Sequence, residues 1–127
     1  MDEKSLIVAP AGTVLCHQDD VAEGEARGFR PAPNAPRRVI VARRYGRLLG
    51  WLDSCPHYQP GWLMAQRGND YLNSAGTHIA CATHGAIFNI DTGQCIMGPA
   101  QGARLTPVPV RVNDDGYVVL KGDLAQE

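Results

Sequence analysis

Two short groups of cysteine and histidine place the strongest constraint on how this chain folds. The first group is Cys-Pro-His at 55–57 and the second is Cys-Ala-Thr-His at 81–84. Each offers one thiolate and one imidazole from a short segment, and both are ligands for soft or borderline metal centres. If all four side chains bind one centre, two loops far apart in the sequence must meet, and the fold has to be built around that meeting point.

The four candidate ligands are Cys55, His57, Cys81 and His84. They match a [2Fe-2S] cluster in which two His replace two Cys on one iron. Each loop then gives one ligand to each iron, with the cysteines on the inner iron and the histidines on the outer iron. A tetrahedral zinc site could use the same residues. The Cys-x-His spacing departs from the usual zinc spacings, so it favours the cluster and leaves zinc open as an alternative.

Size and composition narrow the class of protein further. A chain of 127 residues fits one domain with one core, and its 14 Gly and 9 Pro indicate the many turns of a small all-β fold. The formal net charge of −1 argues against a protein that binds nucleic acid or a membrane surface. The first residues do not resemble a secretory signal, and no stretch has the length of a transmembrane helix. We therefore expect a cytoplasmic protein.

The remaining cysteines and histidines receive a structural interpretation. Cys16 and Cys95 lie outside the two groups. In a cytosolic chain, cysteine near histidine indicates a metal or redox site more often than a disulfide. We interpret Cys16 and Cys95 as half-buried small apolar residues, with a disulfide between them as the alternative. His17 and His78 are interpreted as ordinary surface or strand residues.

Alternating and apolar segments predict short antiparallel strands joined by tight turns. The clearest hairpin pairs 39–43 with 48–52 and delivers the chain directly to Cys55. Residues 18–36 are predicted to be a surface connection, with one helical turn around Asp20 to Glu25. Further strands are expected at 5–8, 78–80, 86–90, 105–112 and 117–120. These elements predict an antiparallel sandwich or barrel whose two ligand groups lie on loops after separate strands.

Two prolines predict an edge strand near the end of the chain. Pro107 and Pro109 are two residues apart, so their missing N–H groups fall on the same lateral side of the segment 105–112. A neighbouring strand cannot pair with that side there.

The segments around the ligands resemble the Rieske ferredoxin family. The matching pieces are Cys55-Pro56-His57, the segment 81–88, Gly93-Gln94-Cys95 and Gly98-Pro99-Ala100, and a weaker likeness extends from Leu6 to Leu120. The resemblance implies a single Rieske domain over 1–127 with three stacked antiparallel sheets. Two sheets would form a base domain, and a small cluster-binding subdomain would span about 53–100. The segment Gly98-Pro99-Ala100 resembles the proline loop that covers the cluster in this family.

Departures from the family pattern predict a low reduction potential. High-potential members carry an extra Cys in each ligand loop, where this chain has Pro60 and Thr83. They also carry a Ser and a Tyr that bond to cluster sulfurs, where this chain has Ala86 and Phe88. Because hydrogen bonds to sulfur stabilise the reduced cluster, their loss lowers the potential.

The resemblance implies a soluble one-electron carrier, a Rieske ferredoxin that is not catalytic alone. Its partners would be a ferredoxin reductase and an oxygenase or another redox acceptor protein, and a monomer is expected. Three alternatives stay open. The chain could be a small Rieske subunit of a larger reductase or oxygenase complex, a redox-sensing regulatory module, or a zinc-binding structural domain. An oxygenase in its own right is not expected, because no second set of His and carboxylate ligands is visible.

Overall fold

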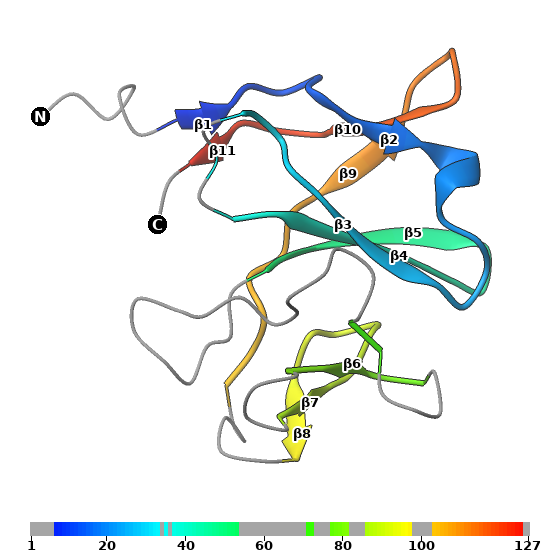
Figure 1. Ribbon diagram of the computed structural model, residues 1–127, viewed down its shortest axis with the longest axis vertical. Coiled ribbons are helices and arrows are strands. Elements are labelled where there is room, and N and C mark those ends of the chain that lie inside the picture. The colour runs from blue at the N-terminus through cyan, green and yellow to red at the C-terminus, as the bar shows by residue number, and fades with distance from the viewer. Residues whose placement is uncertain are drawn as a thin grey trace, which may run out of the picture.

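The computed structural model describes residues 7–33, 35, 37–53, 71–72, 77–81, 86–97 and 103–125. Within these ranges the chain forms short antiparallel strands and one 3₁₀ turn, Gln18–Asp20 (Figure 1). The all-β prediction is confirmed. The strands are β1 (Ile7–Ala9), β2 (Val14–His17), β3 (Ala26–Phe29), β4 (Val39–Arg44), β5 (Arg47–Leu52), β6 (Ile79–Ala80), β7 (Ile87–Phe88), β8 (Cys95–Met97), β9 (Val110–Val112), β10 (Tyr117–Leu120) and β11 (Leu124–Ala125).

The described strands form four sheets. Three sheets have three strands each, in the orders β2-β10-β9, β3-β4-β5 and β6-β7-β8. A two-stranded sheet pairs β1 with β11, so the two ends of the described chain lie side by side. Figure 1 shows the sheet β6-β7-β8 at one end of the molecule, apart from the other three. The resemblance implied three sheets, two of them in the base, whereas the described residues form four, with the sheet β6-β7-β8 apart from the rest.

The central strand β4 is buried on both faces and separates two hydrophobic cores. Val39 and Val41 belong to one core, whereas Ile40 and Ala42 belong to the other. This follows from strand geometry, because successive side chains point to opposite faces. We call the core that contains Ile40 the near core, because it also contains Cys81, and we call the other the far core. Strand β5 divides in the same way, with Trp51 in the near core and Leu52 in the far core.

The predicted hairpin at 39–52 is confirmed, but the prediction for residues 18–36 is wrong in part. The helical turn lies at Gln18–Asp20 instead of around Asp20 to Glu25, and Ala26–Phe29 forms strand β3. Among the described strands, β3 is at the edge of its sheet and pairs with β4 alone. Of its four residues only Ala26 is buried. The segment therefore lacks the alternation of apolar and polar residues that identifies a strand in a sequence.

The segment predicted as a strand over 105–112 is regular only at its end. Strand β9 covers Val110–Val112 and lies at the edge of its sheet, as the prolines predicted. Before it, the chain crosses onto β5, where the Val108 N–H donates to the Gly50 carbonyl at 2.9 Å. Gly50 allows this approach because a Cβ atom there would collide with the Val108 carbonyl oxygen. The sheets β2-β10-β9 and β3-β4-β5 are thus joined without a continuous ladder.

Trp51 joins the base to the sheet β6-β7-β8. Its indole Nε1 donates to the carbonyl of Ile90, the second residue after β7, at 3.0 Å. The turn that follows contains Gly93, which has φ +74° and packs under the indole ring. A Cβ atom at Gly93 would lie 2.7 Å from the ring, so glycine is required by both the backbone angle and the contact.

Candidate metal centre

Cys81 is the one predicted ligand that lies among the described residues, and it is buried at the end of strand β6. Its side chain is 1% exposed and belongs to the near core with Ile79, Ala86 and Phe88. The Cys81 N–H donates to the Ala86 carbonyl at 2.8 Å, which continues the pairing of β6 with β7. This hydrogen bond joins the two residues that flank the segment 82–85. His84 belongs to that segment, which is outside the described residues.

The second ligand group also starts from a fixed position, at the end of strand β5. The Asp53 N–H donates to the Arg38 carbonyl at 3.0 Å, which extends the β4–β5 ladder by one step. Asp53 is fully buried and stands two residues before Cys55. Cys55 and His57 themselves lie outside the described residues. The structure thus places the residues from which both ligand segments start, and one of the four candidate ligands.

A buried polar network of three side chains lies beside the start of the Cys55 segment, and sequence reasoning missed it. The Tyr71 hydroxyl donates to Asp53 Oδ2 at 2.7 Å and accepts from Arg38 Nη1 at 3.1 Å. Burial, followed by the charge of Asp53 and the hydrogen bond to it, raises the pKa of Tyr71 well above its usual value of 10.0, and Arg38 opposes this shift. The phenol therefore stays protonated and donates to Asp53. The available signal was an acidic residue directly after an apolar strand and before Cys55.

The described surroundings of Cys81 fit an iron–sulfur cluster better than an exposed metal site. Ala86 and Phe88 are fully buried next to it in the near core. These are the positions where the resemblance implies the loss of two hydroxyl groups. A thiolate in an apolar, water-excluding environment suits a ligand of the inner iron, whose sulfurs would take hydrogen bonds from backbone N–H groups. Among the described residues alone, no cluster of three or more metal-binding side chains is present.

The other cysteines and histidines have structural roles, but the two cysteines are buried and not half-buried as expected. Cys16 and Cys95 are both buried, form no disulfide and belong to different cores. The Cys95 Sγ donates to the Met97 carbonyl at 3.3 Å. His17 caps the 3₁₀ turn by accepting from the Asp19 N–H, and its ring packs edge-on against Tyr117. His78 contacts the Thr77 hydroxyl at 2.8 Å.

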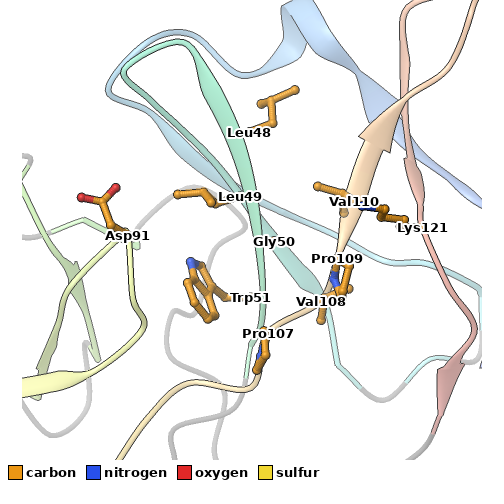
Figure 2. A pocket seen from close by; sticks show the side chains of 10 residues that line it. All are labelled: Leu48, Leu49, Gly50, Trp51, Asp91, Pro107, Val108, Pro109, Val110 and Lys121. Atoms are coloured by element: carbon orange, nitrogen blue, oxygen red, sulfur yellow. The ribbon is translucent and has the colours of Figure 1, made fainter.

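A shallow hollow of about 220 Å³ lies where the chain crosses β5. Figure 2 shows Trp51 and Asp91 at one end, and Val110 and Lys121 at the other. None of its lining residues is a cysteine or histidine. Its lining consists of Leu48, Leu49, Gly50, Trp51, Asp91, Pro107, Val108, Pro109, Val110 and Lys121. Within the described part of the chain, no helix is long and apolar enough to cross a membrane.

Comparisons with known proteins give one family and several similar structures. The model of the Rieske [2Fe-2S] domain matches residues 12–112. The ferredoxin of Sphingomonas yanoikuyae B1 is 25% identical, with a TM-score of 0.65, and the alignment covers 87% of this chain and 97% of that one. No curated protein matches.

Two further structures share the fold at lower identity. The terminal oxygenase of carbazole 1,9a-dioxygenase from Nocardioides aromaticivorans IC177 is 22% identical, with a TM-score of 0.69 over 98% of this chain and 34% of that one. A chain in the complex of reduced oxygenase and oxidised ferredoxin in carbazole 1,9a-dioxygenase is 21% identical, with a TM-score of 0.63 over 89% of this chain and 95% of that one.

Proposed function

We propose an electron-carrier function for this chain, which belongs to the Rieske [2Fe-2S] domain family. It would take single electrons from a ferredoxin reductase and pass them to an oxygenase-type acceptor, as a cytoplasmic monomer with no catalysis of its own. The observation that carries the proposal is the family match over residues 12–112, which spans both cysteine–histidine groups. The cofactor of this family is the [2Fe-2S] cluster, which stores and releases one electron at a time.

The proposed ligands are Cys55, His57, Cys81 and His84, held by a cluster-binding subdomain at about 53–100. Two described features support this assignment. Cys81 is buried where β6 ends, and the hydrogen bond from its N–H to Ala86 closes the base of the segment that contains His84. Both cysteines would bind the inner iron, and both histidines the outer iron. The chain's own contribution is to keep Cys81 away from water and to hold the two loops at a fixed separation.

The proposed contact with redox partners lies beside the segment that resembles the proline loop. Ile96 and Met97 on β8 are 45% and 62% exposed, and Met97 is directly followed by Gly98. Exposed apolar side chains next to a redox centre suit short-lived docking, which requires only a small interface. A structural relative has been captured as a complex of oxygenase and ferredoxin, which supports an oxygenase as the acceptor here.

The second candidate function is a subunit or domain held permanently in a larger oxygenase. It is favoured by the likeness to the terminal oxygenase, of which this chain covers only 34%. The near end-to-end likeness to the Sphingomonas ferredoxin, at 97% of that chain, favours the separate carrier. Size-exclusion chromatography of the expressed chain distinguishes the two. A carrier gives a coloured monomer without partners, whereas an obligate subunit aggregates or loses its cluster when expressed alone.

The decisive experiment is anaerobic absorption and electron paramagnetic resonance (EPR) spectroscopy, with metal analysis. We expect a brown protein that, after dithionite reduction, gives the low average g value and nitrogen couplings of a histidine-ligated cluster. Its midpoint potential should lie near −150 mV, the lower end of the range for Rieske centres. A colourless protein with one zinc per chain would refute the proposal, and a midpoint above zero would refute the low-potential assignment.

A further inference from the structure

Tyr71 forms hydrogen bonds to residues directly before both proposed ligand segments. Through its backbone, the Tyr71 carbonyl accepts from the Ala80 N–H at 2.7 Å, one residue before Cys81. Through its side chain, the hydroxyl donates to Asp53 Oδ2 at 2.7 Å, two residues before Cys55. The next residue, Leu72, forms an antiparallel bridge with Ile79 on β6. One residue therefore spans from the end of β5 to the end of β6.

The base sheet is shaped to receive this side chain. Tyr71 is fully buried in the near core. Its hydroxyl lies over Gly28 of β3, where a Cβ atom would collide with the phenol oxygen and come within 2.9 Å of the ring carbon that bears it. Gly28 pairs with Ile40 of the central strand β4. The φ angle of Gly28 is not in the left-handed region. The requirement for glycine at this position therefore comes from the Tyr71 hydroxyl.

The network also bridges β4 and β5 at the open end of their hairpin, where Arg38 lies opposite Asp53. Arg38 directly precedes β4 and Asp53 directly follows β5, and the Tyr71 hydroxyl bonds to both. Asp53 is the only fully buried charged side chain in the described part of the chain. A hydrogen bond to a buried charge is stronger and more directional than one between neutral groups. It fixes the phenol, and with it β6, relative to the point where the chain leaves β5.

We propose that Tyr71 is a positioning residue that sets the separation between the two ligand loops, and hence between Cys55 and Cys81. The proposal rests on the proposed ligand set. A cluster bound by two loops needs both at the correct distance, because each loop supplies one ligand to each iron. Trp51 ties the base to the turn after β7, whereas Tyr71 ties it to the strand that leads into Cys81. Tyr71 acts through the backbone and does not itself bind the cluster.

The test is the Tyr71→Phe variant of the full chain with its cluster. This change removes only the hydroxyl, and Arg38 and Asp53 both keep other interactions. We expect the cluster to be released about ten times faster under a chelator, since a hydrogen bond to a charged group contributes at least that factor to an equilibrium. The EPR g values and the midpoint potential of the reduced protein should also shift, because the geometry of the ligands changes.

Two matched variants separate positioning from general stability. Tyr45→Phe removes a hydroxyl from a tyrosine that is 76% exposed, and it should leave every readout unchanged. Val118→Ala weakens the far core, where Val118 is fully buried, and should lower the unfolding temperature without changing the g values. The proposal is overturned if Tyr71→Phe keeps the wild-type g values and release rate, or if it matches Val118→Ala in both.

A second pair of variants keeps the test decisive if Tyr71→Phe does not fold. Asp53→Asn retains an oxygen that accepts from the phenol, whereas Asp53→Ala removes the acceptor. We expect the Asn variant to release its cluster within about threefold of the wild-type rate, and the Ala variant at least tenfold faster. Equal rates for the two variants would refute the proposal. Wild-type protein without a histidine-ligated EPR signal would instead refute the proposed function, so the two failures are distinguishable.

Discussion

The two cores on either side of the sheet β3-β4-β5 are built in different ways. The far core is mainly aliphatic, with Val39, Val41 and Leu120 among its buried members. The near core contains Trp51 and Tyr71, which also make buried hydrogen bonds to Ile90 and Asp53. Apolar contacts are non-directional, so they hold elements together without fixing their orientation. The hydrogen-bonded aromatic residues are found on the side that carries Cys81, where, under the proposed ligand set, the orientation of the loops decides whether a cluster can bind.

The largest expected effect is the loss of the cluster when the buried cysteine of the near core, and not that of the far core, is replaced. Cys81→Ala, in the near core, should abolish cluster binding, whereas Cys16→Ala, in the far core, should leave the absorption and EPR spectra unchanged. Both thiols are buried, so the difference reports ligation and not the loss of a buried side chain. Cys95→Ala is the control within the near core and should retain the cluster. A brown Cys81→Ala protein with a wild-type EPR signal would refute the assignment of this ligand.

The next largest effect separates the stability of the protein from the geometry of the cluster ligands. Leu120→Ala in the far core should lower the free energy of unfolding by about 2–5 kcal/mol without changing the EPR g values. Trp51→Phe removes the donor to the Ile90 carbonyl and should cost about 1–3 kcal/mol. Despite this smaller cost, it should accelerate cluster release, because it loosens the turn after β7.

Urea unfolding and chelator assays on both variants check this prediction. If Leu120→Ala releases its cluster faster than Trp51→Phe at a temperature where both are folded, the two cores do not differ in the way described.

The smallest effect is a pH dependence that belongs to the far core. Burial, followed by the charge of Asp20, raises the pKa of the Cys16 thiol from 9.0 to about 11, while Arg27 opposes the shift. Between these pH values the unfolded chain loses a proton that the folded chain keeps. The free energy of unfolding should therefore fall as the pH rises from 9 to 11. The measurement is the difference in urea midpoint between wild type and Cys16→Ala, at pH 8 and at pH 10.5. An equal difference at both pH values would contradict the raised pKa.

The parts of the fold that were predictable from the sequence are those with a local signal. The hairpin of β4 and β5 has a clear pattern of apolar residues, and Pro107 and Pro109 correctly indicated an edge strand. Strand β3 was missed because pairing with β4, and not its own pattern, makes it a strand. Cys81 was identifiable as a candidate ligand from its spacing to His84, and its burial agrees with that role.

The network around Tyr71 could not have been predicted from the sequence. Arg38, Asp53 and Tyr71 come from three separate segments and share no spacing or periodicity. They meet only because β4 and β5 pair in one particular register, which places Arg38 opposite Asp53, and because Gly28 leaves space for the phenol. Such tertiary contacts depend on the complete fold, so no local sequence pattern predicts them.

Successive side chains of β4 pack in different cores, so they have different structural roles. Positions 39 and 41 face the far core, while positions 40 and 42 face the near core. Substitutions at odd positions therefore change the packing of the far core, whereas substitutions at even positions change the packing of the near core, which contains Cys81. A single deletion within β4 would exchange the two sets at once. The strand therefore allows the packing of the far core to be altered separately from the packing around Cys81.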